Sequence, residues 1–196
     1  MKHSFKISLI ILSLGLIFFT GCIKEKLDTP YAPTYMFYDN FKGSLGSFTQ
    51  YSVTGAQVWV DSSYSGTTYA QMSGFSGGSY TANEDWLISK AVNFDSFKNE
   101  TLSFSSATRY GTPGDGSLKV YTSNDYTGTG DPNLATWVEI TPIAISQGNF
   151  TWVSSGSINL SAITGTKVYI AFKYYCSTFG VATWELNQIK LTGDAL

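Results

Sequence analysis

Cysteine and histidine are rare in this 196-residue chain, which contains two cysteines and a single histidine. His3 and Cys22 lie within the first 22 residues, so Cys176 is the only one of the three in the remainder. A Ser-His or Cys-His nucleophile and a histidine-bound zinc ion each require a histidine. We therefore expect none of these sites beyond the N-terminal segment. Cys176 ends an apolar, strand-like run, which predicts a buried and inert thiol.

Charge is also sparse, since only 13% of the residues are charged and the formal net charge is −2. A protein that binds nucleic acid through the phosphate backbone needs an excess of basic side chains, so we expect no nucleic-acid partner. Aromatic residues are abundant instead, at 16%, and they occur together with 19 glycines. This composition favours short strands that are joined by tight turns.

The N-terminus has the pattern of a bacterial lipoprotein signal. Lys2 and Lys6 precede an apolar run over residues 7–18, and the small residue Gly21 is followed directly by Cys22. We expect cleavage before Cys22 and lipidation of its thiol, which would hold the protein on a membrane without a transmembrane helix and leave Cys176 without a disulfide partner. The alternative is an ordinary signal peptide with an incidental cysteine, or an N-terminal anchor that is never cut.

This pattern divides the chain into a signal peptide (1–21), a lipidated cysteine with a flexible tether (22–34) and a folded domain (35–193). The expected location is the cell envelope, as an outer-membrane lipoprotein that is exposed at the surface.

The domain has the alternating apolar and polar residues that are typical of β-strands. Clusters of Gly, Pro, Asn, Asp and Ser separate the runs, and no window after the signal keeps a helical period beyond a single turn near 161–164. The predicted strands span residues 35–40, 48–53, 58–60, 68–72, 85–89, 101–107, 117–122, 137–140, 151–158, 167–174 and 183–191. This spacing predicts an all-β fold, a two-sheet antiparallel β-sandwich of the jelly-roll type.

Several segments, taken together, resemble the choice-of-anchor J and cleaved-adhesin group of jelly-roll domains. The matching segments are FYDNFKG (37–43), NEDWLIS (83–89), LSF (102–104), LKVYTSNDY (118–126), GTGDP (128–132), VYIAFKY (168–174) and WELNQIKL (184–191). The resemblance implies a non-catalytic surface module that binds a glycan or a surface protein. It also implies a structural calcium between the first and last strands, although Asn187 stands where such domains commonly have Asp.

Asp39, Glu185 and Asn187 are the candidate calcium ligands, because oxygen atoms are the ligands that calcium prefers. The alternative is that Asp39 caps a turn and Glu185 is a solvated strand residue. A loop at 123–133 with two carboxylates is a second candidate, but a long hairpin connection with Asx turns is the favoured explanation of its composition.

Exposed aromatic rings can bind sugars by stacking on their C–H faces. Trp59, Tyr64, Tyr69 and Tyr80 lie in or beside Gly/Ser-rich connections and are the candidate ligand-binding residues, whereas Trp86 and Trp184 lie in apolar strands and are expected in the core.

We interpret the chain as a lipid-anchored binding module for a carbohydrate or a protein. Two alternatives stay open. One is a structural or assembly subunit of an outer-surface complex. The other is a glycoside-active enzyme that pairs Glu84 or Asp85 with Glu139 or Glu185.

Overall fold

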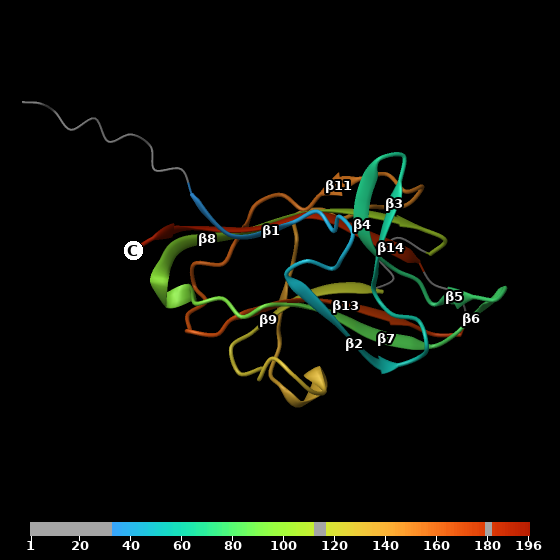
Figure 1. Ribbon diagram of the computed structural model, residues 1–196, viewed down its shortest axis with the longest axis horizontal. Helices are drawn as coiled ribbons and strands as arrows, with labels where there is room; N and C mark the ends of the chain where they lie inside the picture. The colour runs from blue at the N-terminus through green and yellow to red at the C-terminus, as the bar shows by residue number, and fades with distance from the viewer. Residues whose placement is uncertain (1–32, 112–116, 179–181) are drawn as a thin grey trace, which may run out of the picture. The chain divides into compact units, whose positions relative to one another are not determined.

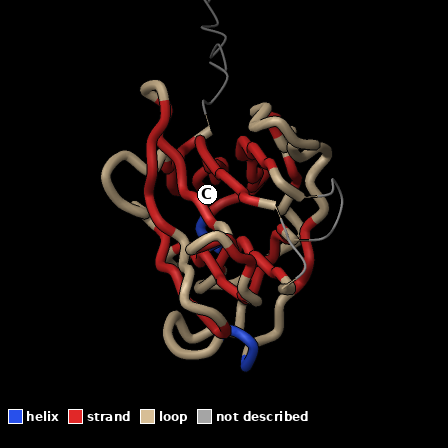
Figure 2. Tube along the Cα trace, turned by 90° about the vertical axis from the view of Figure 1, so that its right-hand side faces the viewer, coloured by secondary structure: helices blue, strands red, loops and turns tan. Residues whose placement is uncertain are grey.

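Strands form nearly all of the regular structure in the computed structural model, which describes residues 33–111, 117–178 and 182–196. The strands make two antiparallel sheets that lie face to face (Figure 1). Two single-turn 3-10 helices, η1 (Phe94–Ser96) and η2 (Pro132–Leu134), are confined to connections (Figure 2). The two facing sheets confirm the predicted antiparallel β-sandwich. Within the described ranges, no helix is long and apolar enough to cross a membrane.

The larger sheet is built around two 13-residue strands, β8 (Phe97–Arg109) and β14 (Thr183–Ala195), which pair along most of their length. The other edge of β14 is shared by β1 (Thr34–Asp39) and β4 (Thr67–Met72), and β3 (Val60–Tyr64) pairs with β4. On the far side of β8 lie two short strands, β11 (Val153–Ser154) and β12 (Ile158–Asn159).

The second sheet has five strands in the order β10-β9-β13-β7-β2. They are β10 (Val138–Ile140), β9 (Leu118–Ser123), β13 (Tyr169–Cys176), β7 (Asn83–Ser89) and β2 (Phe48–Thr54). A small hairpin of β5 (Phe75–Ser76) and β6 (Ser79–Tyr80) belongs to neither sheet. Gly77 and Gly78 form its turn with φ of 59° and 83°, values that favour glycine and that match a two-residue hairpin turn.

The core lies between the sheets, where each strand sends alternate side chains inward. Phe104 from β8 and Phe172 from β13 meet edge to face, with ring centroids 5.0 Å apart. Cys176 is buried, and its thiol donates to the carbonyl oxygen of Thr81, so the prediction of an inert thiol agrees with its surroundings. Trp184 is buried in this core, as the apolar pattern predicts. Trp86 is buried as well, but in a separate cluster on the outer face of the second sheet.

Asp85 is the most deeply buried of the acidic side chains that the structure describes. Asp85 alternates with the outward-facing Trp86 along β7, and its side chain is 0% exposed. Neither carboxylate oxygen has a hydrogen-bond partner among the described residues. Burial raises the pKa of Asp85 to about 7, although the nearby hydroxyl of Ser52 acts to lower it.

Three details differ from the sequence-based expectations. The predicted strand 151–158 is two short strands, because Gly156 at a φ of 72° interrupts it and Ser155 instead bonds to Phe104 through its backbone and side chain. The strand predicted at 58–60 begins at Val60 and continues to Tyr64. The helical turns occur at η1 and η2, not near 161–164, where turns follow β12.

Candidate ligand-binding cleft

A cleft of about 580 Å³ lies on the outer face of the larger sheet, over the region where β3, β4, β14 and β8 are neighbours. Its floor comes from strands and its walls from the β3–β4 hairpin and the segment before β11. Its lining residues are Tyr64, Ser65, Thr67, Tyr69, Gln71, Arg109, Phe150, Trp152 and Glu185. The cleft thus combines four aromatic rings with an amide, a guanidinium and a carboxylate.

Strand alternation explains the polar floor. Trp184 and Leu186 of β14 belong to the core, so Glu185 between them points to the outer face. The register places Glu185 beside Gln71 of β4 on one side and beside Ala107 of β8 on the other. The centre of the floor therefore carries one acidic group flanked by an amide and a small apolar side chain.

Two exposed aromatic rings flank this floor. Tyr64 ends β3 and is 76% exposed, and the following turn places Ser65 and Gly66 at positive φ. Trp152 precedes β11 and is 36% exposed, with its ring centroid 5.9 Å from that of the buried Tyr69. Each exposed ring offers an apolar face to a ligand at the edge of a polar floor.

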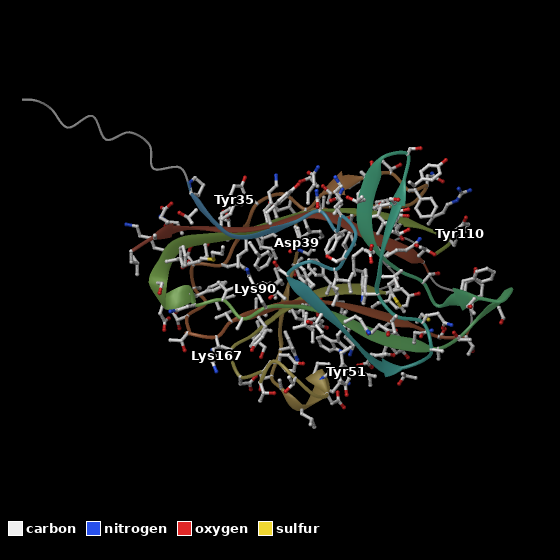
Figure 3. The ribbon with its side chains drawn as sticks, viewed as in Figure 1. Tyr35, Asp39, Tyr51, Lys90, Tyr110 and Lys167 are labelled. Carbon is white, nitrogen blue, oxygen red and sulfur yellow. The ribbon has the colours of Figure 1, made fainter. Side chains whose placement is uncertain are left out.

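Arg109 forms one end of the cleft. Its guanidinium carbon lies 5.1 Å from the ring centroid of Tyr110 and 5.8 Å from that of Phe150, and the two rings meet edge to face. Figure 3 labels Tyr110, which marks this end at the right of the larger sheet. The ion pairs among the described residues join Lys119 to Glu139 and Lys173 to Glu84, and neither involves Arg109.

Glu185 is 6% exposed, and this burial raises the pKa of its carboxyl above the ordinary value, while interaction with the Tyr69 hydroxyl acts to lower it. Burial also raises the pKa of Tyr69, so its phenol keeps its proton at neutral pH. The oxygens of a carboxyl group can accept hydrogen bonds whether or not the group is ionised. The floor is therefore suited to a ligand that presents hydroxyl donors.

The structure divides the four predicted ligand-binding aromatics. Tyr64 and Tyr69 both line the cleft, but the expectation of an exposed Tyr69 is wrong, because its ring is 6% exposed and packs against that of Trp152. Tyr80 lies on β6, where its ring packs 5.1 Å from that of Phe75. The expectation of an exposed Trp59 is wrong. The chain crosses there from one sheet to the other, and the Trp59 side chain is 1% exposed and packs in the core between the sheets. Its indole nitrogen donates to the backbone oxygen of Asp85 at 3.3 Å.

Sequence reasoning missed Arg109, Phe150 and Trp152. They come from β8 and from the connection before β11. That connection is held against β8 by the pairing of Val153 with Ser106 and by a hydrogen bond from the backbone N–H of Phe150 to the carbonyl oxygen of Thr108. Asn149 and Phe150 both have positive φ. Gly148 and Asn149 are typical turn residues and mark a turn here, but they do not show which face the following residues reach.

The predicted calcium ligands are not brought together. Asp39 pairs with Ile189 of the core and lies on the inner side of the larger sheet (Figure 3), where its carboxylate accepts from the backbone N–H of Ser47 at 3.0 Å. Glu185 and Asn187 lie on the outer side, because they alternate with core residues of β14. Within the described part of the chain, no three His, Cys, Asp or Glu residues gather in a metal-binding arrangement.

The carboxylates of the 123–133 loop accept hydrogen bonds from residues within the loop or close to it in sequence. Asp125 accepts from Ser123 and from the backbone N–H of Thr136. Asp131 caps η2 by accepting from the backbone N–H of Asn133 at 2.9 Å. These contacts match the Asx-turn interpretation of the loop.

The acidic residues considered for glycoside hydrolysis are also dispersed. Glu84 and Glu139 each form an ion pair of 2.9 Å with a lysine, and Asp85 faces the interior. Glu185 is the one carboxylate among the described residues that line the cleft. The described lining thus lacks the two carboxyl groups that flank the scissile bond in most glycoside hydrolases.

A smaller groove of about 400 Å³ lies on the outer face of the other sheet, where Tyr51, Tyr126 and Tyr169 contribute to its lining (Figure 3). Here the rings pack on one another and on Trp137, with centroids of Tyr126 and Tyr169 5.1 Å apart. These rings form a second, small hydrophobic cluster next to the 124–137 segment. Because they pack on one another, they offer less open ring surface to a ligand than Tyr64 and Trp152 do in the larger cleft.

Comparison with protein families identifies this chain as a member of the family described as "Domain of unknown function (DUF5017)", whose model matches residues 45–193. Among the curated proteins, none is significantly similar to this chain in sequence.

Solved structures with the same fold include two domains of Lys-gingipain from Porphyromonas gingivalis W83. The K1 cleaved adhesin domain is 19% identical, with a TM-score of 0.54 and coverage of 81% of this chain and 98% of that domain. The K3 cleaved adhesin domain is 17% identical, with a TM-score of 0.54 and coverage of 82% and 100%. At these identities the similarity establishes the jelly-roll fold and nothing further.

Proposed function

We propose that this DUF5017 member is a non-catalytic binding module that holds a glycan in the cleft on the larger sheet. The observation that carries the proposal is the pair of exposed rings, Tyr64 and Trp152, on either side of the polar floor. Sugar rings present C–H faces that stack on aromatic side chains, while their hydroxyls need hydrogen-bond partners such as Gln71 and Glu185. The cleft offers both kinds of contact within one cavity.

A glycan array probed with the full chain in detergent tests this proposal, with Trp152→Ala as the diagnostic variant. Removing an aromatic anchor from a binding site typically costs about 2 kcal/mol, so we expect roughly 30-fold weaker binding of any glycan that the array identifies. The matched control is Tyr35→Ala, since Tyr35 is an exposed aromatic residue on β1 outside the cleft. A blank array, or binding that Trp152→Ala leaves unchanged, would contradict the proposal. Capture of a protein partner alongside a blank array would favour the assembly-subunit alternative.

We further propose that the protein is tethered to the cell envelope through lipid on Cys22, as an outer-membrane lipoprotein exposed at the surface. Cys22 lies outside the described residues, and the support is the basic start, the apolar run and Gly21 before the cysteine. Metabolic labelling with an alkyne-bearing fatty acid should mark the native chain, and Cys22→Ser should abolish the label. Equal labelling of both chains would refute the tether.

A further inference from the structure

Arg109 carries a positive charge into the cleft without an acidic partner. Its guanidinium lies against the rings of Tyr110 and Phe150, and no described residue forms an ion pair with it. The two ion pairs among the described residues join Lys173 to Glu84 and Lys119 to Glu139. Arg109 is the basic residue that the described cleft lining contains. Contact with two rings restricts the movement of the guanidinium and leaves its planar donor edge available.

The nearest acidic group of the cleft does not neutralise this charge. Glu185 lies on β14 opposite Ala107, two residues before Arg109 along β8, so the two side chains are diagonal neighbours on the same face. They form no ion pair within 4 Å, since the guanidinium turns toward the two rings. The cleft therefore has a cationic end at Arg109 and an acceptor-rich floor at Glu185.

We propose that the cleft selects an acidic glycan. Arg109 binds the charged group of one sugar, and the adjacent sugar ring of the glycan stacks against Trp152. This inference rests on the proposed function, because it names the ligand class for the same cleft. The shared chemistry is a sugar that bears a carboxylate or a sulfate ester, because the guanidinium edge can donate two parallel hydrogen bonds to either group.

The geometry also orients the ligand. The acceptor oxygens of Glu185 disfavour an anionic group above them, whereas sugar hydroxyls there would donate to these oxygens. The acidic group is therefore directed to the Arg109 end and the hydroxyls to the floor. A neutral glycan would fill the same stacking positions but would leave Arg109 unpaired.

The test compares chemically matched probes on the full chain in detergent, by isothermal titration calorimetry. The first pair is a panel of hexuronate oligosaccharides and their carboxyl-reduced forms, which keep the sugar stereochemistry and lose the charge. The second pair is sulfated galactan oligosaccharides and their desulfated forms. We expect one acidic panel to bind roughly 10- to 100-fold more tightly than its neutral form, since hydrogen bonds to charged groups are the strong ones. Added salt should weaken only the acidic binding.

Arg109→Gln should bring the affinities of the charged and neutral forms close to each other, while Arg109→Lys should restore part of the difference. Glu185→Gln is the matched control in the same cleft, and it should keep the preference for acidic sugars. Equal affinity for charged and neutral forms would overturn this inference and leave the proposed glycan binding intact. Failure of every charged and neutral glycan would overturn both proposals.

Discussion

Replacing the buried Asp85 by asparagine is expected to stabilise the protein at neutral and alkaline pH. The Asp85 side chain is fully buried, neither carboxylate oxygen has a hydrogen-bond partner among the described residues, and its pKa is raised from 3.8 to about 7. Burial disfavours the charged form, so the folded state holds a proton that the unfolded state has already released between pH 4 and pH 7.

Because the folded state holds this extra proton, the free energy of unfolding of the native protein falls as pH rises from about 4 to about 7. Each pKa unit of the shift corresponds to about 1.4 kcal/mol. A shift of about three units therefore costs the native protein roughly 4 kcal/mol at pH 8. Asparagine is never charged, but its buried amide lacks partners as well, which offsets roughly 1–3 kcal/mol of the gain. We expect Asp85→Asn to be more stable than the native protein by roughly 1–3 kcal/mol at pH 8. Near pH 4, where Asp85 costs little, only the penalty of the buried amide is left, and the variant should be the less stable chain by roughly 1–2 kcal/mol.

Urea unfolding at several pH values between 4 and 8.5 measures this difference. The matched control is Glu84→Gln on the same strand: although burial acts to raise the pKa of Glu84, hydrogen bonds from Lys173, Asn133 and Trp86 lower it. Because its folded pKa is lowered, Glu84 stabilises the protein above its unfolded pKa, and Glu84→Gln should be the less stable chain at pH 8 but not near pH 4. An Asp85→Asn protein with the same stability difference at every pH would refute the reasoning.

Two further predictions concern the end of β1. A methyl group at Gly46, whose φ is 59°, would overlap the Asp39 carboxylate, whereas Gly43, at a φ of 78°, has open space around it. Both Gly→Ala changes place alanine in the left-handed region, at roughly 1–2 kcal/mol, and the overlap should make Gly46→Ala the worse of the two by at least about 1 kcal/mol in thermal unfolding. Equal losses would mean that Asp39 moves aside freely. Because Asp39 lies on the opposite side of the sheet from Glu185, we also expect EDTA to leave the melting temperature unchanged; a drop that added Ca²⁺ reverses would identify a different set of calcium ligands.

The strands were predictable because alternation is a local property. Where a strand has one face in the core, every second residue must be apolar, as in Leu102 and Phe104 of β8. Prediction failed at Trp59, where the same aromatic side chain fits an exposed connection or a buried crossing between sheets. It also failed for the 151–158 segment, where Gly156 breaks a run that has strand-like composition.

The candidate site was predictable only in part. Tyr64 and Tyr69 belong to one hairpin, so nearby turn residues mark them. Arg109, Phe150 and Trp152 line the same cleft but come from β8 and from a distant connection. Their spacing along the sequence does not show that they lie close together in the fold.

The fold class, the signal-like pattern of the first 22 residues and the absence of histidine beyond them are all visible in the amino-acid sequence. These follow from composition and from patterns of short range, which depend on each residue and its close neighbours. Only the tertiary structure decided which aromatic rings stay exposed, which side of the sheet each carboxylate faces, and that Arg109 shares a cleft with Glu185. Those properties depend on strand register and on the pairing of segments far apart in the chain, where a shift of one residue moves a side chain to the opposite face.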